Sequence, residues 1–382
     1  MGSSVLNSDN VSAIGPSTER SAPGSRLSKS SIAILLFLVL VAAAAIAWPK
    51  SNYDGVFYTA LTLRTNDALA LHAAGMQFAD RDPETVDSPY RDDLRKSPAH
   101  FQQQLPFYTV KPLYVVLLTL ARNAGLGGRS GAFLSAISYC LLGGTAFFWL
   151  RRTYPDSTAA LFTVILLLNP TALELIRWTS PDMMAICAAM IATCLIVEFE
   201  RPFLGVAVLV LGIWIRPETI LYAGLLLFVL FLTKRLPITA ACGFAAAALA
   251  SYFFITRNSY SFSVLFYHSV VEELTAPAQA HIALTRPVYF AALKHTLQYL
   301  SFANPLLCFP PLACAIQYFA LGRRNLATAV SFAALIAAGL LFLAYPNFEA
   351  RYFLSTLFYI PSLCLLVQIK RSASAQKSPQ PC

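Results

Sequence analysis

Asp54 combines a reactive side chain with a setting in which it could act on a substrate. It follows an apolar run, Ser31–Trp48. Aromatic and aliphatic side chains surround it at helical spacing: Tyr53, Phe57, Tyr58 and Leu61. We expect them to form a face on a bilayer surface, with polar groups turned toward a cavity, and we predict that Asp54 is a catalytic base. The alternative is that Asp54 caps a short helix, because aspartate before an apolar periodic run is a good N-cap.

Three later turns between apolar runs carry charges of both signs: Arg177–Asp182, Arg216–Glu218 and Asn347–Arg351. The apolar runs before and after Arg216, its two arms, are about 13 and 15 residues long. At ~1.5 Å per residue they reach only about 20 Å into the hydrocarbon core of a bilayer, which is roughly 30 Å thick. We therefore expect this tip to be recessed, where ionisable groups are costly and mark function. The alternative is that Arg216 pairs with Glu218 or Asp182 only to neutralise a buried turn.

These charged residues together predict a site for a lipid that carries phosphate. The predicted phosphate ligands are Arg177, Arg216 and Arg351, because the planar guanidinium binds phosphate through two hydrogen bonds. Supporting carboxylates are predicted at Glu84, Asp182 and Glu218. Carboxylates in such a site serve as a general base or hold a divalent cation. The spacing of these residues does not specify a set of metal ligands, and we therefore assign no cofactor. A divalent cation held by the carboxylates stays possible.

Composition identifies the chain as a polytopic membrane protein. Of its 382 residues, 57% are hydrophobic and 12% are charged, and the mean hydropathy is +0.59. Soluble domains contain about 25% charged residues. The formal net charge of +9 comes largely from Lys and Arg at the ends of apolar runs, as membrane-topology signals do. We therefore exclude nucleic acid as a partner and expect contact with membrane lipids.

The fold class that we predict is an all-α polytopic membrane protein with ten transmembrane helices. The predicted spans are Ser31–Trp48, Ser130–Leu150, Thr158–Ile176, Met183–Phe199, Phe203–Ile215, Thr219–Thr233, Ile238–Thr256, Leu297–Leu321, Leu326–Tyr345 and Tyr352–Ile369. Basic clusters at their ends then fall on one side, which places both termini in the cytoplasm. The high Ala and Leu content favours a bacterial cytoplasmic membrane.

The apolar stretch Val110–Arg122 is too short to span a membrane unaided. Counting it as a crossing would move Arg151, Arg152 and every later basic pair outside. We therefore predict a juxtamembrane or re-entrant helix within a long first outer loop, residues 49–129. The predicted domains are a disordered cytoplasmic tail (1–30), the transmembrane domain (31–370) and a second cytoplasmic tail (371–382).

The segments after several of these spans resemble the glycosyltransferase-C superfamily. The resemblance is carried by Asn52–Asp54, Pro106–Tyr114, Arg177–Asp182, Arg216–Glu218 and Glu349–Tyr352. The most similar branch is the mannosyltransferase-like membrane enzymes that use polyprenyl-phosphate sugars. The likeness covers most of residues 31–370, as pattern and topology more than as a strict motif.

The resemblance implies an inverting transfer of sugar from a polyprenyl-phosphate donor to a glycan, lipid or protein acceptor at the outer or lumenal face. Asp54 matches the aspartate of the first outer loop that activates the acceptor in that family, and Asp182 matches a second acidic residue at the next outer turn. The chain departs from many members in having one acidic residue after Tyr53 where they have a pair, which weakens the case for a bound metal.

Two other functions remain open at this point. A glycolipid flippase or transporter would use the charged turns to gate a path, and inverted repeats or paired broken helices would favour it. A lipid-linked oligosaccharide polymerase would also present arginines on its outer face.

Overall fold

The computed structural model describes residues 28–80, 89–279, 282–300, 305–321 and 325–376. Within these residues the chain is entirely helical and contains no strand, as the sequence predicts. Glu84 and most of the two predicted tails lie outside the described residues. The last helix runs to Gln376, so the chain is helical beyond the predicted start of the second tail at residue 371.

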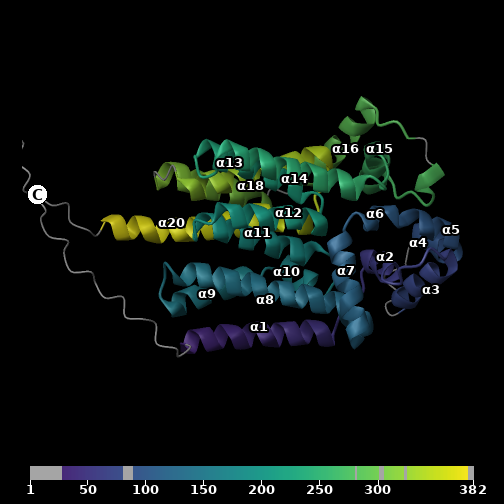
Figure 1. Cartoon of the computed structure of the whole chain (residues 1–382), viewed down its shortest axis with the longest axis horizontal. Coiled ribbons are helices and arrows are strands. Elements are labelled where there is room, and N and C mark those ends of the chain that lie inside the picture. Colours follow the sequence, from purple (N-terminus) through teal and green to yellow (C-terminus); the bar gives the residue numbers. More distant parts are fainter. Residues whose placement is uncertain (1–27, 81–88, 280–281, 301–304, 322–324, 377–382) are drawn as a thin grey trace, which may run out of the picture.

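Apolar helices of different lengths lie side by side and form a bundle (Figure 1). They are α1 (Lys29–Ala47), α8 (Ser130–Arg151), α9 (Asp156–Leu167), α10 (Pro170–Leu175), α11 (Asp182–Val197), α12 (Pro202–Ile215), α13 (Thr219–Leu232), α14 (Ile238–Thr256), α17 (Pro305–Ala315), α18 (Leu326–Ala344) and α20 (Ile360–Gln376). The start of α1 and the end of α20 lie at the same end of this bundle.

Five helical segments among the described residues are long and apolar enough to cross a membrane: Lys29–Ala47, Pro112–Arg151, Ile238–Thr256, Leu326–Ala344 and Ala350–Ala373. Shorter apolar helices, including α12 and α13 with 14 residues each, accompany them. These lengths and compositions are those of a membrane protein. The number of ten crossings stays a prediction.

Helix α7 (Pro112–Ala121) runs across the bundle (Figure 1). Two glycines interrupt the apolar stretch between α7 and α8: Gly125 has φ 92° and Gly127 has φ 52°, a region that side chains with a Cβ rarely adopt. The short helical turns η2 (Arg122–Leu126) and η3 (Gly127–Arg129) contain this break. The direction of α7 agrees with a helix that lies along a surface.

The other helices of the predicted first outer loop gather at one end of the bundle (Figure 1). They are α2 (Tyr53–Leu61), α3 (Ala68–Ala79), α4 (Pro89–Lys96), α5 (Pro98–Gln104) and α6 (Pro106–Thr109). Phe57 and Tyr58 are fully buried there, and the Phe57 ring stacks on Phe101 at 4.9 Å and on Tyr108 at 4.5 Å. The expectation that these aromatic residues rest on a bilayer is wrong, because the loop helices bury them in a core of their own.

A second segment, which we expect on the same side of the membrane and call the second outer segment, reaches over to this cluster. It contains α15 (Phe262–Phe266), η4 (Tyr267–Val271), η5 (Pro277–Gln279) and α16 (Arg286–Tyr299). The Gln104 side-chain amide donates to the carbonyl of Leu274 at 2.8 Å, and the Tyr260 hydroxyl donates to the carbonyl of Gln103 at 2.7 Å.

The chain ends with η6 (Ile316–Ala320), α18, α19 (Ala350–Phe353), η7 (Leu354–Tyr359) and α20.

An ion cluster fastens three bundle helices together at the opposite end. The Glu198 side chain is 4% exposed and forms ion pairs with Arg152 of α8 at 3.0 Å and Arg371 of α20 at 2.8 Å. The indole nitrogen of Trp149 also donates to Glu198 at 3.0 Å. These contacts link the end of α8 to α20. The short helix α19, which carries Arg351, precedes α20 in the chain.

Candidate functional site

Asp54 lies in the first turn of α2, and Asn52 occupies the N-cap position. The Arg351 guanidinium donates to Asp54 Oδ2 at 2.8 Å, and the Tyr108 hydroxyl donates to Asp54 Oδ1 at 3.4 Å. The interpretation of Asp54 as a helix cap is therefore wrong. Its carboxylate faces residues that are far away in the sequence.

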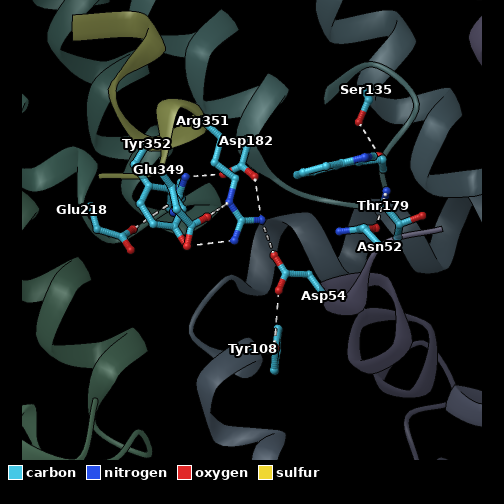
Figure 2. A network of polar contacts seen from close by, with 12 residues as sticks. Asn52, Asp54, Tyr108, Ser135, Thr179, Asp182, Glu218, Glu349, Arg351 and Tyr352 are labelled. Carbon is cyan, nitrogen blue, oxygen red and sulfur yellow. Dashed lines mark hydrogen bonds and ion pairs between the residues drawn. The ribbon is translucent and has the colours of Figure 1, made fainter. Parts of the chain in front are cut away.

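Arg351 lies at the centre of the polar network in Figure 2. Its Nε donates to Glu349 at 2.6 Å, and its Nη2 donates to the Tyr352 hydroxyl at 3.0 Å. Its Nη1, which holds Asp54, also lies 3.7 Å from Asp182 Oδ2. One guanidinium thus joins the first outer loop to the start of α11.

Arg216 binds the other side of the Asp182 carboxylate. Its Nε lies 3.5 Å from Glu218 Oε2, and its guanidinium lies over the Tyr352 ring at 4.2 Å. The Arg216 side chain is 11% exposed and that of Asp182 is 2% exposed, whereas Glu218 in the same turn is 36% exposed. The depth of the turn in a bilayer stays a prediction. Neutralisation accounts for these ion pairs, but Arg216 Nε and Glu218 Oε2 remain buried without a hydrogen-bond partner.

Local contacts hold the turn that leads into Asp182 against α2 and α8. The Thr179 backbone amide donates to Asn52 Oδ1 at 3.1 Å, and the Ser135 hydroxyl donates to the Trp178 carbonyl at 3.0 Å (Figure 2). The turn passes so close to Gly131 that a Cβ there would lie 2.6 Å from the Thr179 Cα. The residues around Asp182 and Asp54 are therefore fixed to each other by the backbone as well as by Arg351.

A cavity of about 60 Å³ lies below the Arg216 turn, between α11, α13, α18 and η7. Charged and aromatic side chains line one part of it: Arg216, Glu218 and Tyr352. Small apolar side chains line another part: Ala185, Ala189 and Ala338. Asp54 and Asp182 belong to the same polar network but do not line this cavity. The arrangement offers an amphiphile charged and apolar surroundings in one place.

Lys111 is a cation at the site that the sequence reasoning missed. Its Nζ lies 5.4 Å from the ring centres of both Tyr58 and Tyr108. Among the described residues, no carboxylate lies within ion-pair distance of it. Burial lowers the pKa of Lys111, while the negative charges of Glu218 and Asp54 act in the opposite direction. The signal in the sequence is a lysine inside the apolar stretch Val110–Arg122, whose length bears on topology but does not by itself mark a binding site.

The electrostatics of Asp54 favour the carboxylate form. Burial by itself raises the pKa of this side chain, but the positive charges of Arg351 and Lys111, the hydrogen bond from Arg351 and the charge of Arg216 outweigh it. The resulting pKa lies below the ordinary value for aspartate. Asp54 is therefore ionised at neutral pH, as a proton acceptor must be.

Of the predicted site residues that the structure describes, Arg177 is not in this network. Arg177 is exposed, and its Nε donates to the carbonyl of Trp48 at the end of α1 at 2.8 Å. Glu84 lies outside the described residues. The structure thus brings together Asp54, Asp182, Arg216, Glu218 and Arg351, and it adds Lys111, Tyr108, Glu349 and Tyr352.

The donor set does not resemble a metal site. Among the described residues, no group of three or more His, Cys, Asp or Glu side chains is placed to hold a metal ion. Asp54 and Asp182 already face guanidinium groups, which take the oxygen positions that a divalent cation would need. We derive no chemistry through a metal.

The network can combine a carboxylate base with cations that stabilise a phosphate oxygen. Comparisons of the chain with models of known protein families, with curated proteins and with solved structures found no match.

Proposed function

We propose that this protein is an inverting membrane glycosyltransferase of the glycosyltransferase-C type. It transfers a sugar from a polyprenyl-phosphate donor to a glycan, lipid or protein acceptor, with Asp54 as the base. The observation that carries the proposal is the convergence of Asp54, Asp182, Arg216 and Arg351, which come from four separate segments, in one polar network.

The charges of this network suit the chemistry of transfer. An acceptor hydroxyl attacks the anomeric carbon, a new carbon–oxygen bond forms, and the proton goes to Asp54. The bond from the anomeric carbon to the phosphate oxygen breaks, and its electron pair leaves with the phosphate. Lys111 is the cation without a carboxylate within ion-pair distance among the described residues, and Arg216, although it pairs with Asp182, has an Nε without a hydrogen-bond partner. We assign these two cations to the phosphate because Arg351 already bonds to Asp54, Glu349 and Tyr352.

The cavity below Arg216 supports a lipid substrate. Its alanine walls lie among bundle helices, and the charged turn closes one part of it. A lipid phosphate would place its charge at the turn. In this proposal the α2–α6 cluster lies outside a bacterial cytoplasmic membrane, and both termini lie in the cytoplasm.

Replacement of the proposed base tests the function directly. Asp54→Asn keeps the size of the side chain but removes the proton acceptor, and a positioned base contributes ~10²–10⁴-fold to a rate. We expect kcat to fall by that factor in an assay with purified protein, radiolabelled polyprenyl-phosphate sugars and candidate acceptors. The variant should keep the expression level and thermal unfolding midpoint of the wild type.

Asp67→Asn is the matched control. Asp67 belongs to the same loop, is exposed and caps α3 by accepting from the Leu69 amide at 3.0 Å. Asparagine caps a helix about as well as aspartate, so transfer should be unchanged. Near wild-type transfer by Asp54→Asn would refute the catalytic role of Asp54. Absence of transfer by the wild type itself would favour a lipid flippase or transporter.

A further inference from the structure

Glu349 connects Arg351 to the second outer segment. Its Oε2 accepts from Arg351 Nε at 2.6 Å, and its Oε1 accepts from the Asn347 side-chain amide at 3.3 Å. The same Asn347 nitrogen donates to the carbonyl of Ser269 in η4 at 3.2 Å. A chain of polar contacts therefore runs from Ser269 through Asn347 and Glu349 to Arg351.

Several carboxylates lie within reach of Arg351, and the orientation of its guanidinium decides to which of them it donates hydrogen bonds. Its Nη1 lies 2.8 Å from Asp54 and 3.7 Å from Asp182. The guanidinium is planar, so a hydrogen bond that fixes Nε also fixes the direction of both terminal nitrogens. Glu349 accepts that hydrogen bond, and its carboxylate is anchored in turn by Asn347.

We propose that Glu349 is a positioning residue: it orients Arg351 so that this guanidinium holds Asp54 in place, and it offsets part of the Arg351 charge. This inference rests on the proposed function, because it gives Asp54 the role of base. Glu349 itself does not touch the proposed reacting atoms.

The negative charge of Glu349 acts together with every titratable group around Asp54 and Arg351. These groups are Tyr58 from α2; Tyr108, Lys111 and Tyr114 from the end of the first loop; Asp182 from α11; Arg216 and Glu218 from the next turn; and Tyr352 from α19. Removing the charge of Glu349 leaves Asp54, Asp182 and Glu218 to balance Arg216, Arg351 and Lys111. The site then attracts a phosphate at least as strongly as before, while Arg351 loses its fixed direction.

Glu349→Gln tests the role by separating kcat from KM. Loss of a charge-assisted hydrogen bond that orients Arg351 should lower kcat by roughly 10–100-fold. KM for the polyprenyl-phosphate donor should stay equal or fall, because the variant carries one negative charge less near the phosphate. General damage to the fold would instead raise KM or lower the thermal unfolding midpoint.

Glu174→Gln is the matched control for loss of an outer carboxylate. Glu174 pairs with Lys50 at 2.9 Å and both side chains are nearly half exposed, away from the network. Its replacement should leave both kinetic constants unchanged.

Asn347→Ala provides a second and independent readout. It should lower kcat in the same direction as Glu349→Gln but by a smaller factor, since it removes only the anchor of Glu349. The double variant should resemble Glu349→Gln within about twofold, because residues in one hydrogen-bond chain are not additive.

The outcomes distinguish this inference from the function on which it rests. If the wild type transfers sugar but Glu349→Gln keeps its kcat, or if the two effects multiply in full, the positioning role is refuted and the function stands. If the wild type transfers no sugar in any assay, the proposed function and this inference fall together.

Discussion

At the scale of single residues, Arg351 sets the protonation of Asp54. Burial raises the pKa of Asp54, and Arg351 is the largest opposing influence, so the pKa lies below its ordinary value. Wild-type activity should therefore show no loss through Asp54 between pH 7 and about pH 5. In Arg351→Met the largest influence opposing burial is lost, the pKa of Asp54 rises, and the fall of kcat/KM on acidification should begin at a higher pH than in the wild type. A flat profile for the variant would contradict this electrostatic account.

Arg216 should depend on the shape of its side chain as well as on its charge. It bonds to Asp182, lies 3.5 Å from Glu218 and stacks on Tyr352, which a lysine ammonium cannot do at once. We expect Arg216→Lys to fold normally and to weaken donor use by about 1–3 kcal/mol. Steady-state kinetics with varied donor concentration measures this, and unchanged donor dependence would count against a phosphate role for Arg216.

Lys111 should contribute to donor binding and not to stability. It is a partly buried cation that faces two tyrosine rings and has no carboxylate within ion-pair distance among the described residues. Lys111→Met keeps the length of the side chain and removes this charge, so the thermal unfolding midpoint should be unchanged or higher. Donor KM should rise by about tenfold, as for one lost charge-assisted contact. An unchanged KM would remove Lys111 from the phosphate site.

At the scale of elements, the close approach of α8 to the Thr179 turn is what holds Asp182 in position. A Cβ at Gly131 would lie 2.2 Å from Thr179 Oγ1 and 2.6 Å from the Thr179 Cα, and backbone cannot yield as a side chain does. Gly131→Ala should shift this turn, lower the thermal unfolding midpoint and reduce transfer. Gly144→Ala in the same helix is the control, because its Cβ meets no atom within 4 Å. That variant should be unchanged or more stable by up to about 1 kcal/mol. Equal behaviour of the two variants would contradict the packing argument.

At the scale of the whole molecule, the end of the bundle that carries α2–α6 should face the outside. Asn66 and Ser157 are exposed, and they lie in the first loop and at the start of α9. In a variant without reactive native cysteines, Asn66→Cys should react with an impermeant maleimide added to intact cells. Ser157→Cys should react only after permeabilisation. The reverse pattern would overturn the orientation.

The sequence by itself determined the helical class and the short arms of α12 and α13, and it predicted Asp54, Asp182, Arg216 and Arg351 as site residues. The length and composition of an apolar run indicate a membrane-spanning helix, and charges in a turn between short runs are costly to bury. Those inferences need only local composition and length.

Only the tertiary structure decided which of these charged residues meet. Arg177 has the same guanidinium group as Arg351, yet it binds the end of α1, because a side chain cannot reach a site that its turn does not face. Lys111 and Glu349 looked ordinary in sequence, and they gained their significance from partners far away along the chain. The aromatic rings beside Asp54 give a further example, because the sequence predicts that they contact a bilayer and the structure buries them in protein. Periodicity shows that a helix face is apolar but does not show whether lipid or protein covers it.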